Sequence, residues 1–251
     1  MDFKNKMIID FNVEIGNSIE FKFSLEELIR IMNENNIDKA IVSPIRGRYY
    51  IDLFKEANKY IKNSISKYKD RLYGFAIVNP WFNNEATIEL RKSIKEYNLK
   101  GLKLFPSIQG YKVNHEIIYP LMEEVNKLKI PIFIPSGYPP STPLQIADLA
   151  EVFPEVNIIM GHSGFTTFWL ELLPAMKRCE NLYGELSCQT NVRALKEVIE
   201  KIGVERFLYG SSLPFSHPII EIEKIKLLNL SKEEEEKILW KNALKLLNIK
   251  K

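Results

Sequence analysis

Residues 130–161 read IPIFIPSGYPPSTPLQIADLAEVFPEVNIIMG, and they hold one full repeat of the pattern that decides the fold. The stretch opens with an apolar run at 130–135, continues with a helical pattern at 143–153, and ends with a second apolar run at 157–161. Both runs are continuous in apolar character, which is typical of parallel strands covered on both faces. The stretch therefore predicts a β–α–β unit of a parallel sheet.

Working outward, the same alternation fills the chain from end to end. Eight strands are predicted, at 7–13, 39–43, 72–79, 101–105, 130–135, 157–161, 182–187 and 206–210. The predicted helices lie at 24–36, 51–68, 85–97, 116–128, 143–153, 168–179, 192–202, 219–228 and 232–247. An open doubly wound sheet is the rival, but the first turn, Glu14-Ile15-Gly16-Asn17, lacks its glycine-rich phosphate loop. The α/β class is therefore predicted as one (β/α)8 TIM barrel over residues 1–251, with an extra C-terminal helix.

Composition excludes several classes of protein. With 251 residues, 45% hydrophobic and 27% charged, the chain has the balance of a globular protein with a large core. The formal net charge is +3 and the charges of both signs are interspersed, so we expect no nucleic-acid partner. The longest uncharged stretch, 130–147, holds five prolines, and we expect no membrane span. The two cysteines show no metal-binding spacing, and a cytoplasmic location is expected.

Barrels of this kind carry their chemistry where strands end and the loops to the helices begin. The polar side chains at predicted strand ends are therefore the candidates for a site. They are Asn12, Glu14, Ser43, Asn79, Lys103, Ser136 beside Pro135, His162, Ser187, Ser211 and Ser212.

Several of these stretches, in their order and spacing, resemble one known family. They are Ile9-Asp10 and the segments 68–80, 101–106, 109–111, 130–137, 161–164, 210–215 and 236–243. The chain resembles, over nearly its whole length, the amidohydrolase family of metal-dependent hydrolases. The resemblance is to the branch that includes decarboxylases and lactonases of small carboxylated compounds. It implies a TIM barrel and a divalent metal such as zinc.

The departures from the family pattern concern the metal. The family's two histidines at the end of strand one fall on Asn12 and Glu14, and its strand-five histidine falls on Pro135. Its strand-eight aspartate falls on Ser212, so that His162 alone keeps the family residue. A catalytic zinc needs about three protein ligands, and proline offers none. From the sequence we therefore expect a degenerate metal site, no metal ligands and no cofactor.

Glu14, Lys103 and His162 are the predicted catalytic residues. His162 is placed to act as a general base or to bind a substrate oxygen; the alternative is an inherited histidine satisfied by a neighbouring serine. Lys103 either binds a carboxylate or forms an internal ion pair with Asp10 or Glu14. The ion pair is favoured, because a buried lysine needs a partner.

The predicted substrate-binding residues lie mainly in the loops around the barrel mouth. Arg46 and Arg48 could clamp an anionic substrate, since a guanidinium matches a carboxylate; the alternative is that both are solvated. Tyr111 either covers the mouth or packs beside it. The set is completed by Asn12, Asn79 and Ser212.

Two functions follow from these residues. The first is a hydrolase-like enzyme for a small anionic substrate, with weak, metal-independent activity on an activated ester or lactone. The second is a non-catalytic relative that binds a small molecule or a partner. A homo-oligomer is compatible with both. The density of polar strand-end residues favours retained small-molecule binding.

Overall fold

A computed structural model describes residues 6–19, 21–46 and 51–249 of the chain. Its strands form one sheet in the order β2-β1-β3-β4-β5-β6-β7-β8-β9, parallel except for the β1–β2 pair. The strands are β1 (Ile9–Asn17), β2 (Lys22–Phe23), β3 (Lys39–Pro44), β4 (Leu72–Ile77), β5 (Gly101–Lys103), β6 (Ile132–Pro135), β7 (Ile158–Gly161), β8 (Leu182–Glu185) and β9 (Phe207–Leu208).

Hydrogen bonds join the first parallel strand, β1, to the segment that follows the last strand, β9, and close the curled sheet. Phe11 N donates to Tyr209 O at 3.0 Å, and Glu14 N donates to Leu213 O at 2.9 Å. Neighbouring parallel strands follow the chain order around the sheet. The predicted barrel of parallel strands is thereby confirmed, with the strand ends meeting at one mouth.

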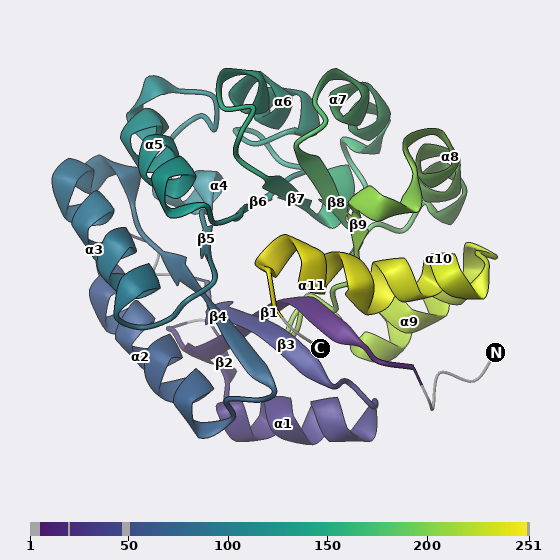
Figure 1. The fold of residues 1–251 in the computed structure, drawn as a ribbon, viewed down its shortest axis with the longest axis horizontal. Helices are drawn as coiled ribbons and strands as arrows, with labels where there is room; N and C mark the ends of the chain where they lie inside the picture. Colours follow the sequence, from purple (N-terminus) through teal and green to yellow (C-terminus); the bar gives the residue numbers. More distant parts are fainter. Residues whose placement is uncertain (1–5, 20, 47–50, 250–251) are drawn as a thin grey trace.

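Helices surround the sheet (Figure 1). They are α1 (Leu25–Glu34), α2 (Phe54–Lys67), α3 (Asn83–Lys95), α4 (Pro106–Gln109), α5 (Tyr119–Leu128), α6 (Pro143–Val152), α7 (Leu172–Arg178), α8 (Val192–Ile202), α9 (Pro218–Leu227), α10 (Lys232–Glu236) and α11 (Asn242–Leu247). Within the described part of the chain, no helix is long and apolar enough to cross a bilayer.

Two apolar clusters stabilise the barrel. The larger cluster fills the layer between the strands and the outer helices. The smaller one lies inside the barrel, where Ile9, Phe11, Phe75 and Phe133 pack with the C-terminal helix α11 through Ala243, Leu244 and Leu247. Burying these side chains contributes about 25 cal/mol for each Å2 of apolar surface removed from water. We call this smaller cluster the apolar plug. Because it fills one end of the barrel, polar side chains can gather only at the other end.

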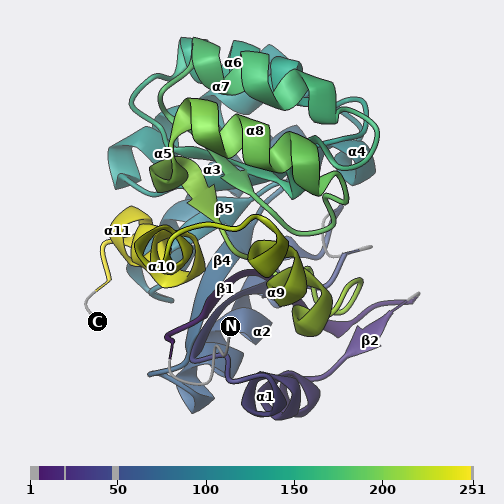
Figure 2. The same cartoon turned by 90° about the vertical axis from the view of Figure 1, so that its right-hand side faces the viewer.

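The structure departs from the predicted elements at several points, which include the unpredicted helix α4 and the three differences described next. The short strand β2 was not predicted; it pairs with β1 beyond the barrel and lies on the opposite side from the C terminus (Figure 2). The last predicted helix, at 232–247, is divided by a π-helical segment, Lys237–Lys241. The last predicted strand, at 206–210, ends at Leu208, because Tyr209 N donates to Ile238 O at 3.0 Å while Tyr209 O still accepts from Phe11 N of β1.

Candidate active site

The carboxyl ends of the barrel strands surround a cavity of about 220 Å3. Arg46, His162 and Ser212 of the predicted site line it. The other lining residues are mostly aromatic or small and polar: Phe105, Ser107, Pro135, Ser136, Tyr138, Ser141, Phe165, Cys188 and Phe215. The cavity lies at the end of the barrel where enzymes of this fold carry their chemistry.

Arg46 presents a fixed planar cation to this cavity. Its guanidinium carbon lies 3.7 Å from the ring centroid of Phe215 and 5.1 Å from that of Phe105. The Glu14 carboxylate accepts hydrogen bonds from the Arg46 backbone N at 2.7 Å, from Nε at 3.3 Å and from Nη2 at 3.3 Å. Held between a carboxylate and two rings, the guanidinium has little freedom, and 24% of its side chain is exposed.

Lys103 forms the second ion pair with the same carboxylate. Its Nζ lies 2.9 Å from Glu14 Oε1 and 3.0 Å from Asn12 Oδ1, and 5.0 Å from the ring centroid of Phe133. Of the two partners considered from the sequence, Lys103 therefore pairs with Glu14 and not with Asp10. All these polar side chains are buried, and such a pair is stable only because each charge has close partners.

The charges around Glu14 control its ionisation. Burial is the largest single effect and opposes ionisation, but the charges and hydrogen bonds of Lys103 and Arg46 together lower the pKa of Glu14 to about 2. Burial lowers the pKa of Lys103, and the Glu14 charge opposes that shift. Glu14 is therefore an ionised carboxylate engaged by two cations and is poorly suited to accept a proton.

A β-bulge in β1 brings these side chains into the barrel. From Asp10 to Val13 the register advances three residues along β1 while the partner strand β3 advances two. Before the bulge, Phe11 belongs to the apolar plug inside the barrel. After it, Asn12 and Glu14 reach Lys103 inside the mouth. The extra residue shifts the alternation of the strand, so that both sets face inward.

His162 lies on the cavity wall and is bound from behind. Its Nδ1 lies 2.9 Å from Ser187 Oγ, which lies 2.9 Å from Glu185 Oε2. Glu185 also accepts hydrogen bonds from the backbone N of His162 at 3.1 Å and of Ser187 at 2.7 Å. The ring is thus held at one nitrogen and at its backbone. Burial, with the charges of Lys103 and Arg46, lowers the pKa of His162 to about 3, so the ring is neutral near pH 7.

Strained backbone is concentrated at this mouth. Five non-glycine residues near or on the cavity wall have positive φ: His162 (65°), Ser163 (46°), Phe165 (51°), Cys188 (58°) and Ser212 (56°). Such conformations are unfavourable for residues with a Cβ and persist only where the surrounding structure enforces them. The mouth is therefore built to a specific shape.

Below the mouth, Asp10 carries an unpaired buried oxygen. Its Oδ1 accepts the backbone N–H groups of Ser211 at 2.8 Å and Asn12 at 3.2 Å. Its Oδ2 and the Tyr209 hydroxyl are the buried side-chain atoms without a hydrogen-bond partner among the residues that the structure covers. Burial raises the pKa of Asp10 to about 7, although the hydrogen bonds from Ser211 and Asn12 oppose the shift.

Three predicted substrate-binding residues, Asn12, Asn79 and Tyr111, do not line the cavity. Asn79 caps the 3-10 turn Pro80–Phe82 and donates to Ile51 O at 2.9 Å. The buried Tyr111 hydroxyl donates to Gln109 Oε1 at 3.0 Å. Local hydrogen bonds therefore engage the side chains of Asn79 and Tyr111. Arg48 lies outside the described residues.

Sequence reasoning missed the aromatic wall and the buried acid. Phe165 and Phe215 follow strands as loop residues, and loops have no periodicity from which an inward direction could be read. Glu185 was missed although a signal existed. It is a carboxylate within an apolar strand, two residues before Ser187, and alternation places both on one face.

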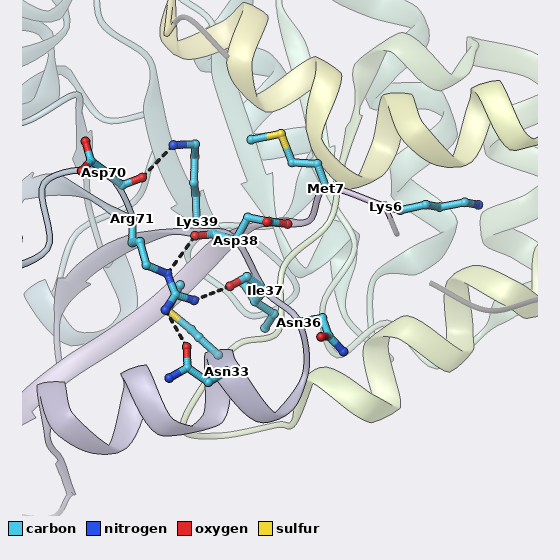
Figure 3. Close-up of a pocket in the computed structure, with 10 residues that line it drawn as sticks. Lys6, Met7, Asn33, Asn36, Ile37, Asp38, Lys39, Asp70 and Arg71 are labelled. Carbon is cyan, nitrogen blue, oxygen red and sulfur yellow. Dashed lines mark hydrogen bonds between the residues drawn. The ribbon is translucent and has the colours of Figure 1, made fainter. Parts of the chain in front are cut away.

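The larger hollow of the molecule lies at the other end of the barrel (Figure 3). It measures about 850 Å3 and is lined by residues just before β1, β3 and β4. Arg71 donates to Ile37 O at 2.6 Å, to Asp38 O at 3.1 Å and to Asn33 Oδ1 at 2.6 Å, and Lys39 donates to the backbone of the segment before Arg71. These cations bind the loops together, and we place no site there.

Several known proteins resemble this chain in sequence or in fold. The chain is 21% identical to gamma-resorcylate decarboxylase of Polaromonas sp., covering 88% of this chain and 86% of that protein. A crystal structure of a putative amidohydrolase from Staphylococcus aureus has a TM-score of 0.82 at 21% identity, covering 97% of this chain and all of that one. A 5-carboxyvanillate decarboxylase structure from Novosphingobium aromaticivorans has a TM-score of 0.82 at 17% identity, covering 98% and 97%.

These structures correct the expectation that no cofactor is involved. The 5-carboxyvanillate decarboxylase was crystallised with manganese, as were other similar structures, which points to a divalent metal cofactor in the family. In this chain the described residues contain no group of three or more His, Cys, Asp or Glu side chains that could hold a metal ion. The Lys103 ammonium lies against Asn12 and Glu14. We therefore assign no ligands and derive no step through a metal.

Sequence and fold agree on the family. A sequence model of the amidohydrolases matches residues 50–249, which is well over half of the chain. The matched part runs from α2 to α11 and includes Lys103, His162 and Ser212. Two of the relatives named above are decarboxylases, one of gamma-resorcylate and one of 5-carboxyvanillate. The chain belongs to the amidohydrolase family.

Proposed function

We propose that this protein binds a small aromatic carboxylate in the mouth cavity and releases its carboxyl group as carbon dioxide. One observation carries the proposal: the Arg46 guanidinium is stacked 3.7 Å from Phe215 at the wall of a cavity that Phe105, Tyr138 and Phe165 also line. A guanidinium fork matches a carboxylate in shape and charge. Aromatic walls match the flat face of a ring.

The size and charge of the cavity support the same ligand. A volume of about 220 Å3 is below the usual range for drug-sized ligands of roughly 300–1,000 Å3 and suits a single ring. The bidentate contact with Glu14 fixes the guanidinium before a ligand arrives, so less side-chain entropy is lost on binding. In this proposal Glu14 and Lys103 position Arg46 and do not themselves transfer protons.

Decarboxylation requires a bound carboxylate, shielding from water and a group that handles one proton. The carboxyl carbon leaves as neutral carbon dioxide, its bonding electrons stay on the ring carbon, and a proton replaces it there. His162 is the cavity-lining side chain that we assign to the proton: its neutral ring takes up a proton from a hydroxyl group of the ligand or from water and then delivers it to the ring carbon. Aromatic side chains around the site disfavour the charged substrate relative to neutral products.

Hydrolysis, expected from the sequence, has less support than decarboxylation. A hydrolytic base must accept a proton from water, and Glu14 is engaged by Lys103 and Arg46 on both oxygens, so that this role would fall to His162 alone among the predicted catalytic residues. The names of the similar proteins also favour loss of a carboxyl group. Binding without turnover is the remaining alternative, and the test below separates it from both reactions.

The test is a panel of single-ring aromatic carboxylates, assayed for carbon dioxide release and for thermal stabilisation. Each assay is run with and without added Mn2+, because similar structures contain manganese. Activated esters and lactones are assayed in parallel. Arg46→Gln is expected to weaken binding roughly 10- to 100-fold, since it removes a charge-assisted contact. Arg30→Gln, which breaks an exposed pair with Glu34, serves as the matched control and should change nothing.

Each outcome decides between the alternatives. Carbon dioxide release that falls in Arg46→Gln but not in Arg30→Gln supports the proposal. Stabilisation by carboxylates without release under either metal condition overturns turnover and favours a binding protein. Ester or lactone cleavage without decarboxylation overturns the proposal in favour of a hydrolase.

A further inference from the structure

A buried chain of hydrogen bonds leads from Lys103 to the back of His162. Lys103 Nζ lies 3.0 Å from Asn12 Oδ1, and Asn12 Nδ2 lies 3.2 Å from Glu185 Oε2 and 3.3 Å from Ser187 Oγ. Ser187 Oγ in turn lies 2.9 Å from Glu185 Oε2 and 2.9 Å from His162 Nδ1. Glu185 and Ser187 are completely buried. The chain therefore has no access to water that could reverse its hydrogen bonds.

The direction of the first hydrogen bonds follows from chemistry. An ammonium group can only donate, so Asn12 must accept from Lys103 through Oδ1. This fixes the orientation of the Asn12 amide and turns its NH2 group toward Glu185 and Ser187. The Lys103 ammonium, which can only donate, thereby fixes the direction in which the Asn12 amide donates.

The surroundings of Glu185 fix the Ser187 hydroxyl. Glu185 receives N–H groups from the Ser187 backbone at 2.7 Å, from the His162 backbone at 3.1 Å and from Asn12 at 3.2 Å. Burial raises the pKa of Glu185, whereas the hydrogen bonds from Ser187 and His162 lower it. The Glu185 carboxylate, surrounded by donors, also accepts a hydrogen bond from the Ser187 hydroxyl. The lone pair of Ser187 Oγ then remains for His162.

We infer that Ser187 and Glu185 hold His162 in the tautomer with the proton on Nδ1, which leaves the Nε2 lone pair facing the cavity. Nδ1–H donates to Ser187 Oγ, Ser187 donates to Glu185, and Asn12 donates to both. A ligand at this wall must then offer His162 an O–H or N–H donor. Ser187 and Glu185 are positioning residues, because they act through His162. The inference rests on the proposed function only for the ligand that meets this lone pair.

The tautomer can be measured directly, without a substrate. Only three histidines are present, so ring 15N signals are assigned by comparison with His162→Asn. In the wild-type protein near pH 7 we expect a protonated Nδ1 signal and an unprotonated Nε2 signal for His162. In Glu185→Gln the new amide NH2 can donate to Ser187 Oγ. The serine proton then turns to His162 Nδ1, and the ring signals should exchange their character.

Two further variants keep the test decisive. Ser187→Ala removes one hydroxyl and is expected to fold even if Glu185→Gln does not. It should release His162 into a mixture of tautomers. Glu89→Gln is the matched control: Glu89 is also a buried carboxylate, bound to Asn58 and Ser93 in the outer layer of the barrel, and its replacement should leave the His162 signals unchanged.

A wild-type spectrum with the proton on Nε2 would overturn the inference, as would unchanged signals in both Glu185→Gln and Ser187→Ala. The two proposals fail separately. The expected spectrum in a protein that releases no carbon dioxide contradicts the proposed reaction alone. Carbon dioxide release by a protein with the opposite tautomer contradicts the positioning role alone.

Discussion

The two hollows at opposite ends of the barrel differ in how they use their cations. The hollow before the strands is larger, about 850 Å3, yet Arg71 directs its donors to backbone carbonyls and to Asn33. The mouth cavity is smaller, about 220 Å3, and Arg46 there is held by a carboxylate and stacked on aromatic rings. The first arrangement ties loops together, and the second presents a cation to a ligand.

The difference shows that volume is a poor guide to function in this fold. At the base, cations satisfy carbonyl groups that loop ends would otherwise leave unpaired. At the mouth, the charge of Arg46 is fixed by Glu14, which is itself fixed by Lys103. The base hollow should therefore affect stability alone, whereas the mouth should affect both stability and binding.

The largest effect on the free energy of unfolding is expected from Glu14→Gln, which removes the carboxylate charge at the mouth. The variant leaves the Lys103 ammonium buried without its carboxylate, and breaking a buried pair in this way costs about 3–5 kcal/mol. The free energy of unfolding, measured by urea denaturation, should fall by that amount. Glu34→Gln, which breaks an exposed pair with Arg30, should cost less than about 1 kcal/mol. Equal losses in both variants would contradict the role given to the mouth cluster.

Asp10→Asn tests a buried carboxyl group of β1, the strand that runs from the base hollow to the mouth cavity. The pKa of Asp10 is about 7 in the folded protein against an ordinary value near 3.8, so the folded protein binds more protons between these values. The stability contributed by protonated Asp10 is complete below about pH 4 and is lost as pH rises toward 7. The advantage of Asp10→Asn over the wild type should grow across that range to at most about 4 kcal/mol.

Chemical denaturation of both proteins between pH 4 and pH 8 measures this difference. Taking the difference removes the contributions of Glu14 and His162, which both proteins share. A difference that stays constant with pH would show that Asp10 is ionised in the folded protein at little cost.

The smallest effect is expected at the base. Arg71→Gln removes hydrogen bonds to Ile37, Asp38 and Asn33 and should lower the free energy of unfolding by about 1–2 kcal/mol. Carboxylate affinity should stay at the wild-type value, in contrast to Arg46→Gln. A titration of Arg71→Gln with the same carboxylate checks this. Weaker binding in Arg71→Gln would break the comparison, because it would couple the base hollow to the ligand.

The fold could be predicted because its signals are local and repeated. Each parallel strand is a short apolar run, and each outer helix has its own polar face. The short strand β2 escaped because two residues carry no pattern. The C-terminal helix was predicted as continuous because a π-helical turn such as Lys237–Lys241 leaves no mark in the hydrophobic pattern.

Site residues could be predicted from the sequence only where a polar residue interrupts or ends an apolar strand. Glu14, Lys103 and His162 were predicted in this way, and the structure places all three at one end of the barrel. The stacking of Arg46 on Phe215 joins two loops far apart in the sequence, and no local pattern encodes that contact. The absence of a cofactor was inferred from missing ligands, and manganese in similar structures overturned that expectation.

The bulge in β1 makes this strand intolerant of changes in length. Deleting one residue between Asp10 and Val13 would restore a regular ladder with β3. The deletion would leave Ile9 and Glu14 on the inward face, but it would remove one of the two adjacent inward side chains, either Phe11 of the apolar plug or Asn12 beside Lys103. Loops around the mouth can gain or lose residues at small entropic cost. We expect insertions and deletions in variants of this protein to occur in those loops and not in the bulged segment of β1.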